Sequence, residues 1–204
     1  MIKEEIVKRI LSSIILIPTV LFFIIKGSFL FNFFIFICFL ITTYEWLKLS
    51  KNNLFKVFGT IFIIISFYTI FKIRNEFDRD YFHLLLVAII CVSTDIGGYL
   101  FGNIFKGPKL TKISPKKTYS GVIGSFLMSL IFTYLFLEFS SNVQTFEFTK
   151  EMLLFILLVS FVSQIGDLII SYFKRKSKMK DTGSIIPGHG GILDRIDGVI
   201  FALP

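Results

Sequence analysis

The sequence is poor in charged residues and in cysteine. Only 18% of its residues are charged, whereas soluble globular chains carry about 25%. Its two cysteines, Cys38 and Cys91, lie inside apolar stretches and show no CxxC or other metal-ligand spacing. The first absence argues against a soluble domain, and the second against a disulfide scaffold or a cysteine zinc site.

Two further features are missing. No A-x-A cleavage site follows the first apolar run, which contains Pro18 and bulky residues, so this run is predicted to be a retained helix and not a signal peptide. The chain also shows no internal repeat and no low-complexity linker. A repeat would be expected of many membrane transporters.

Apolar residues dominate the composition of the chain. The 204 residues are 54% hydrophobic and include 27 phenylalanines, and several apolar stretches approach the ~20 residues that cross a hydrocarbon core. We therefore predict an all-α, polytopic membrane bundle of about six transmembrane helices. The apolar end, Ile196–Pro204, is too short to span and is predicted to be a stub or a re-entrant cap. The predicted spans are 9–26, 29–47, 57–73, 82–105, 119–139 and 151–173.

The distribution of lysine and arginine predicts the orientation. With the N-terminus in the cytoplasm, 17 of the 22 lysines and arginines fall on the inner side of these spans. Because basic residues concentrate in cytoplasmic loops, this arrangement is strongly favoured. The loops 106–118 and 174–195 then both face the cytosol. The outer five are Lys26, Lys72, Arg74, Arg79 and Lys150.

Two aspartates lie within predicted spans, where an ionised carboxylate costs at least ~2.5 kcal/mol and therefore indicates function. Asp95 lies in the fourth span and Asp167 in the sixth. Ser171 follows Asp167 by four residues and so shares its helix face. An Asp and a Ser hydroxyl together suit Mg²⁺, which prefers oxygen ligands. The alternative is that each acid pairs with a lysine and only holds helices together.

Small residues recur at four-residue spacing in two neighbouring spans. Gly98 and Gly102 form GxxxG, and Gly121 and Ser125 form a similar pair. Such pairs are typical of close helix–helix packing in a bilayer. The same faces are compatible with a homodimer.

The two inner loops carry features of phosphate binding. In KGPKLTKISPKKT, residues 106–118, five lysines precede a predicted helix, and a helix N-terminus with free N–H groups binds phosphate readily. In the last segment, Gly188, Gly190 and Gly191 surround His189, so the backbone can approach a phosphate closely. Asp194 and Asp197 are three residues apart and face the same way on a helix, with Arg195 on another face.

The pattern from about residue 93 to residue 204 resembles the phosphatidate cytidylyltransferase (CDP-diacylglycerol synthase) family. The signature of that family is present as Ser171, Lys174-Arg175, Lys180-Asp181, Pro187-Gly188-His189-Gly190-Gly191 and Leu193-Asp194-Arg195-Ile196-Asp197. The Ser-Pro-Lys-Lys-Thr of residues 114–118 and the Asp95–Gly102 segment are also similar to family elements. Residues 1–90 match only in hydropathy.

The resemblance implies an enzyme that transfers CMP from CTP to phosphatidic acid, releasing pyrophosphate. It implies a Mg²⁺ site at Asp167, Ser171 and Asp194, with Asp95 as an additional candidate and K⁺ as a candidate second ion. The catalytic residues expected on this basis are Asp167, Asp194, Lys174, Arg175 and Asp197. The residues expected to bind substrate are Lys116, Lys117, Thr118, Lys180, Asp181, His189, Gly190, Gly191 and Arg195. For His189, a structural role in the turn is an equally open alternative.

The same prediction divides the chain into an N-terminal scaffold, residues 1–80, and a catalytic region, residues 81–204. The expected partners are CTP, phosphatidic acid and membrane lipids, with no nucleic acid, and the expected location is the bacterial inner membrane. Ser120 and Ile170 stand where the family usually has acids, and relatives generally continue beyond Pro204. A catalytically impaired, compact or truncated member is therefore an alternative, and an ion-coupled transporter is another.

Overall fold

The computed structural model of the protein describes residues 2–77, 81–111, 114, 117–140 and 148–204. Within these ranges the chain forms helices and isolated bridges but no β-strand. Six helices are long and apolar enough to cross a membrane, which confirms the predicted all-α bundle. They are α1 (Ile2–Lys26), α2 (Ser28–Leu49), α3 (Asn53–Lys72), α4 (Phe82–Phe105), α5 (Tyr119–Ser140) and α6 (Lys150–Lys176).

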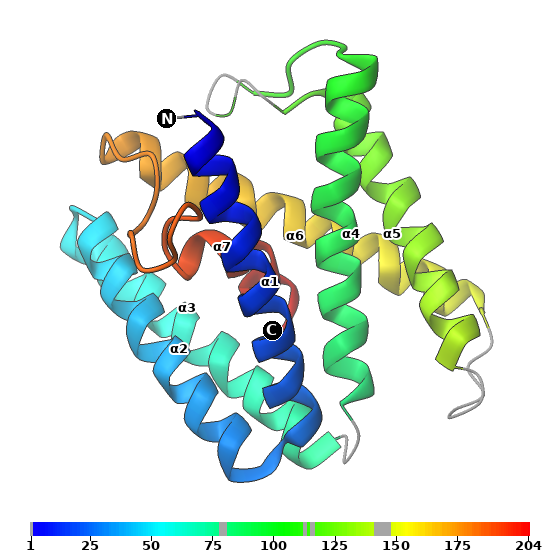
Figure 1. Ribbon diagram of the computed structural model, residues 1–204, viewed down its shortest axis with the longest axis horizontal. Helices are drawn as coiled ribbons and strands as arrows, with labels where there is room; N and C mark the ends of the chain where they lie inside the picture. Colours follow the sequence, from blue (N-terminus) through cyan, green and yellow to red (C-terminus); the bar gives the residue numbers. More distant parts are fainter. Residues whose placement is uncertain (1, 78–80, 112–113, 115–116, 141–147) are drawn as a thin grey trace.

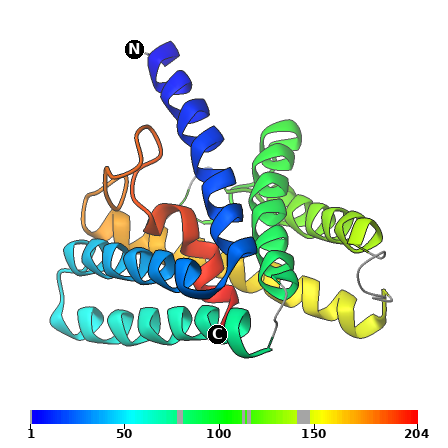
Figure 2. The same cartoon turned by 60° about the horizontal axis from the view of Figure 1, so that its bottom comes forward.

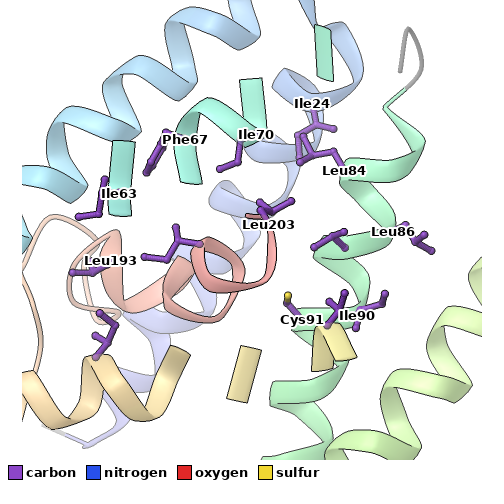
Figure 3. Packing of buried hydrophobic residues seen from close by; sticks show 14 of the residues in the cluster. Ile24, Ile63, Phe67, Ile70, Leu84, Leu86, Ile90, Cys91, Leu193 and Leu203 are labelled. Carbon is purple, nitrogen blue, oxygen red and sulfur yellow. The ribbon is translucent and has the colours of Figure 1, made fainter. Parts of the chain in front are cut away.

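The C-terminal stub is a helix of its own. α7 (Leu193–Ala202) begins earlier than predicted and includes Asp194 and Asp197. It packs mainly on α6 and also contacts α2, α3 and α4, so it lies near the centre of the bundle in Figure 1. Leu193, Ile200 and Leu203 belong to a buried apolar cluster shared with these helices (Figure 3). A short π-helical turn, η1 (Ile73–Phe77), follows α3.

Apolar side chains on the outside of the bundle fit a lipid environment. Phe29 on α2 is 76% exposed and Phe139 on α5 is 88% exposed. Because a soluble protein rarely exposes large contiguous apolar patches, these faces are expected to contact acyl chains. The mean hydropathy of the six candidate spans, 1.7 to 2.3, supports the same assignment.

The α4–α5 pair has the most extensive contacts of any two helices, and glycine makes this possible. A Cβ on Gly97 would lie 2.4 Å from the carbonyl oxygen of Gly124, and a Cβ on Gly121 would lie 2.8 Å from that of Gly98. The backbones are thus too close for larger residues. The packing interpretation of the small residues is confirmed within one chain.

A pair of glycine substitutions tests this packing. Gly97→Ala should lower the thermal stability of the purified protein, because its methyl group meets backbone atoms, and overpacking costs about 1–3 kcal/mol. Gly102→Ala is the matched control, since its Cβ would meet the Thr118 hydroxyl at 3.2 Å and the Gly121 Cα at an ordinary contact distance of 3.9 Å. Thermal unfolding in detergent should rank Gly97→Ala clearly below Gly102→Ala. Equal melting temperatures would contradict the described α4–α5 contact.

Buried hydroxyl groups form hydrogen bonds between the spans in the apolar interior. The Thr94 hydroxyl donates to Ser160 Oγ at 2.8 Å, and Ser125 donates to the Thr94 carbonyl at 2.8 Å, which joins α4, α5 and α6. Ser66 on α3 donates to the Ile200 carbonyl on α7 at 2.7 Å. Polar groups in an apolar interior need such partners. The last of these bonds crosses the predicted boundary at residue 80, although the predicted division of roles there stays a prediction.

Candidate active site

The pair predicted from spacing on α6 is present. Asp167 and Ser171 lie one turn apart, and the Ser171 hydroxyl donates to Asp167 Oδ1 at 3.2 Å. The other carboxylate oxygen of Asp167 lies 2.5 Å from Lys117 Nζ. Lys117 comes from the first basic loop, so this ion pair brings the loop against the C-terminal half of α6.

The second basic segment reaches the same helix through Lys174. Its Nζ lies 2.8 Å from Asp194 Oδ1 at the start of α7. The other oxygen of Asp194 accepts hydrogen bonds from Thr182 N at 2.7 Å, from Thr182 Oγ1 at 3.0 Å and from Gly191 N at 3.0 Å. Asp194 is therefore buried, and its partners among the described residues are all donors.

These partners determine the ionisation of Asp194. Burial alone would raise its pKa, but the hydrogen bonds from Lys174 and the Gly191 N–H, the Lys174 charge and the Thr182 N–H hold the pKa below its ordinary value. Asp194 is consequently an anion at neutral pH. It can orient Lys174 and fix the loop that precedes α7.

A third acid, Asp197, lies one turn further along α7. Burial, followed by the negative charges of Asp167 and Asp95, raises the pKa of Asp197 to about 8. The acids of α4, α6 and α7 are therefore close enough for their charges to repel one another, and a cation among them would be stabilised. Asp95 itself is exposed on α4. Among the residues that the structure describes, no three His, Cys, Asp or Glu side chains form a ready-made metal cluster.

The remaining predicted residues take different positions. Thr118 is buried, and its hydroxyl accepts a hydrogen bond from Gly121 N at 3.1 Å, which caps the start of α5. Arg175, Lys180, Asp181 and Arg195 are exposed. Lys116 lies outside the described residues. Each assigned role in binding or catalysis stays a prediction.

The glycines of the last segment serve two separate purposes. Gly188 and Gly190 have φ of 76° and 88°, a region that favours glycine, so the predicted turn is present there. Gly191 is needed for space instead, because a Cβ there would lie 2.3 Å from Thr182 Oγ1 and 2.4 Å from Glu45 Oε2.

His189 is held by the first helix. Its Nδ1 lies 2.6 Å from the Ser12 hydroxyl and its Nε2 lies 3.3 Å from the Ser13 hydroxyl. Arg9 Nε donates to the Gly188 carbonyl at 3.0 Å. Partial burial, together with the charges of Arg195 and Arg9, lowers the pKa of His189, so the imidazole is neutral at pH 7. Figure 2 shows α1 extending beyond the other helices, and it is the N-terminal half of α1 that contacts this loop.

These contacts predict a role for two serines that sequence reasoning did not identify. Replacing Ser12 and Ser13 by alanine should loosen the turn at His189, because a hydrogen bond contributes about 1 kcal/mol. Hydrogen exchange at residues 188–190 should rise several-fold. Thr19→Ala is the control, since the Thr19 hydroxyl bonds only to Ile15 of its own helix. Unchanged exchange in the double variant would show that α1 does not hold the loop.

A further buried acid, Glu45, is not among the candidates that the sequence patterns indicate. It lies on α2, is 1% exposed, and accepts hydrogen bonds from Thr182 Oγ1, Ile192 N and Leu193 N. As the only acid of α2, close to the C-terminal end of a span, it could have been found by the reasoning applied to Asp95 and Asp167.

The two departures from the family pattern also have defined surroundings. Ile170 is 2% exposed and belongs to the apolar core, so this position faces packed side chains. Ser120 lies 2.9 Å from Thr118 Oγ1, next to the cap of α5. The ion pairs of Asp167 and Asp194 are present in the chain that carries these two residues.

Comparison with known proteins identifies the family of the chain. A model described as "Cytidylyltransferase family" matches residues 53–204. A protein of Rickettsia typhi named phosphatidate cytidylyltransferase is 35% identical over 210 residues, covering 99% of this chain and 90% of that protein. A protein of the same name from Haemophilus influenzae is 38% identical over 164 residues, covering 76% of this chain and 57% of that protein. The chain, with its basic segments joined to the acids of α6 and α7, belongs to the cytidylyltransferase family.

Proposed function

We propose that the protein is a phosphatidate cytidylyltransferase, an integral membrane enzyme that makes CDP-diacylglycerol. A phosphate oxygen of phosphatidic acid attacks the α-phosphorus of CTP, the bond to the β-phosphate oxygen breaks, and pyrophosphate leaves. The observation that carries the proposal is the meeting of Lys117 with Asp167 and of Lys174 with Asp194. Family membership supports the same activity.

The chemical task is to bring two polyanions together. The lipid phosphate is already an anion, so the reaction needs no covalent intermediate and no dedicated general base. It needs charge neutralisation and alignment of the attacking and leaving oxygens. Lys117 and Lys174 lie beside the acids, and Arg175, Lys180 and Arg195 are exposed nearby in sequence. In the proposal, these cations bind the triphosphate and the lipid phosphate.

The acids fit a divalent cation by their chemistry. Asp167 and Ser171 present hard oxygen atoms 3.2 Å apart, which Mg²⁺ prefers. Asp95 and Asp197 belong to the same region, and because the pKa of Asp197 is raised to about 8, a bound cation there would favour its ionised form. Asp167 and Ser171 would hold Mg²⁺, with Asp194 and Asp95 as further ligands, and the bound ion would neutralise phosphate charge. Because the described partners of Asp194 are donors, its role as a ligand requires Lys174 or the loop to move. A second ion, K⁺, stays a prediction.

The membrane placement follows from charge and hydropathy. The six apolar helices indicate an integral membrane protein, and the bacterial relatives favour the inner membrane. We propose that the N-terminus and the two basic segments face the cytosol, where CTP is available, as the lysine and arginine distribution predicts. Phosphatidic acid would enter laterally, with its acyl chains against the apolar outer faces.

A homodimer also belongs to the proposal, but its interface needs revision. The glycine faces that suggested it are covered by the α4–α5 contact inside one chain. A dimer would therefore use another apolar face. Size measurement of the purified protein in detergent distinguishes a dimer from a monomer.

An assay on the purified protein tests the proposed function. The protein in detergent, with labelled CTP, Mg²⁺ and phosphatidic acid, should release pyrophosphate and form CDP-diacylglycerol only when the lipid is present. Folded protein that forms no product would instead favour the catalytically impaired alternative. Ion flux in vesicles without nucleotide turnover would favour the transporter.

A further inference from the structure

Glu45 is the most deeply buried acid among the described side chains. It comes from α2, outside the region that the family model matches, residues 53–204. A buried carboxylate is costly unless it is fully hydrogen-bonded. Its donors all come from residues 182–193, more than 130 positions away along the chain. The described hydrogen bonds of Glu45 therefore all come from the segment that leads into α7.

The first effect of Glu45 is to cap α7. Oε1 accepts from Ile192 N at 3.1 Å and Oε2 accepts from Leu193 N at 2.8 Å. The first N–H groups of a helix have no partner within the helix, and α7 has no side-chain cap of its own. An anion at this end is also favoured by the helix dipole. The start of α7, where Asp194 lies, is thus fixed by a residue of α2.

The second effect runs through Thr182. The Thr182 hydroxyl is fully buried and lies 3.0 Å from Glu45 Oε2 and 3.0 Å from Asp194 Oδ2. A hydroxyl has one proton, so it can donate to only one of these carboxylates at a time. The two acids are joined through this single group.

Two glycines leave the space that this connection requires. A Cβ on Gly183 would lie 2.6 Å from Glu45 Oε1, and a Cβ on Gly191 would lie 2.4 Å from Oε2. The loop is therefore shaped around the Glu45 carboxylate. This contact explains Gly191, whose φ does not demand glycine.

We propose that Glu45 is a positioning residue of the transfer reaction, which acts through Thr182 and the start of α7 to hold Asp194 and its partner Lys174 in place. The inference rests on the proposed function for its kinetic consequence. It gives α2 a role in the reaction, whereas the predicted division made residues 1–80 a scaffold. Glu45 itself does not contact the reacting phosphates.

Glu45→Gln is the first test. The amide keeps the size of the side chain but turns one acceptor into a donor that faces a backbone N–H. We expect kcat to fall about 10- to 100-fold, because small misplacements of catalytic groups have effects of that size. KM for CTP should change less than threefold, since the exposed basic residues are untouched. Glu151→Gln, an exposed acid in the first turn of α6, is the matched control.

Thr182 variants separate positioning from folding. Thr182→Val keeps the shape but removes the hydroxyl, and it should reproduce the loss of kcat, whereas Thr182→Ser keeps the hydroxyl and should restore most of it. The Glu45→Gln/Thr182→Val double variant should be little worse than the more severe single variant, because both remove the same connection. Additive losses, or a lowered melting temperature with unchanged kcat, would overturn the proposal.

Hydrogen exchange provides a readout that does not depend on activity. In Glu45→Gln, amides of residues 182 and 191–194 should exchange at least several-fold faster, while α5 stays unchanged. The wild-type protein could form no CDP-diacylglycerol while exchange at these amides still rises in Glu45→Gln. In that case the proposed function fails, but Glu45 does position the start of α7. If exchange is unchanged, Glu45 does not position the segment, whatever the activity.

Discussion

Replacing Asp167 by asparagine should reduce CDP-diacylglycerol formation by at least about 100-fold, the size expected when a main electrostatic stabiliser of a transition state is lost. Asp167 contacts both Ser171 and Lys117, and it is the acid through which the first basic loop reaches α6. Asparagine has the same shape but no charge, so it can neither pair with Lys117 nor bind Mg²⁺ well. Initial rates at saturating CTP and phosphatidic acid measure the effect.

A substitution elsewhere on α6 is the control for Asp167→Asn. Glu151→Gln on the same helix should keep wild-type activity, because Glu151 lies in the first turn, at the far end from Asp167. Asp167→Asn should also weaken Mg²⁺-dependent thermal stabilisation of the protein. Wild-type activity in a folded Asp167→Asn variant would remove Asp167 from the mechanism.

Replacing Asp194 by asparagine should damage both stability and activity. The described partners of this carboxylate are donors: Lys174 at one oxygen, and at the other the Thr182 and Gly191 N–H groups and the Thr182 hydroxyl, which is shared with Glu45. An amide nitrogen in either position would face a donor. Breaking such a buried pair costs about 3–5 kcal/mol. Thermal unfolding should show a large drop, and activity should be lost even below the new melting temperature.

The pH dependence of unfolding provides an independent check on Asp194. Because its pKa is lower in the folded protein than in the unfolded chain, its contribution to stability is fully present above the unfolded pKa, near 3.9. That contribution is lost as the pH falls through the folded pKa. The difference in stability between wild type and Asp194→Asn should therefore shrink on acidification. A difference that does not change with pH would contradict the described ion pair.

Local patterns in the chain were sufficient for part of this description. The six spans and the exact bounds of 82–105 were predictable, because bilayer crossing demands a long apolar run whatever the neighbours are. The Asp167–Ser171 pair was predictable too, since a spacing of four places two side chains on one helix face. Gly188 and Gly190 indicated a turn because their backbone angles are intrinsic to glycine.

Other parts depended on contacts between distant segments. Nothing in the spacing of Lys117 indicated that it would pair with Asp167 instead of remaining a free phosphate ligand. Thr118, predicted to bind substrate, is found capping α5. Asp197 could be placed on the Asp194 face of a helix, but its proximity to Asp95 and Asp167 required the packing of α7 among α4 and α6.

Short segments of the chain are enough to predict a membrane bundle with acids and basic loops at one end, because hydropathy, charge and helical spacing are local properties. Which acid pairs with which lysine depends on how the helices pack. The same packing places Glu45, Ser12 and Ser13 of the N-terminal helices against the last segment. The physical reason is distance along the chain. A carboxylate on α2 finds the open N–H groups of α7 only after both helices have packed, so no local pattern records the contact.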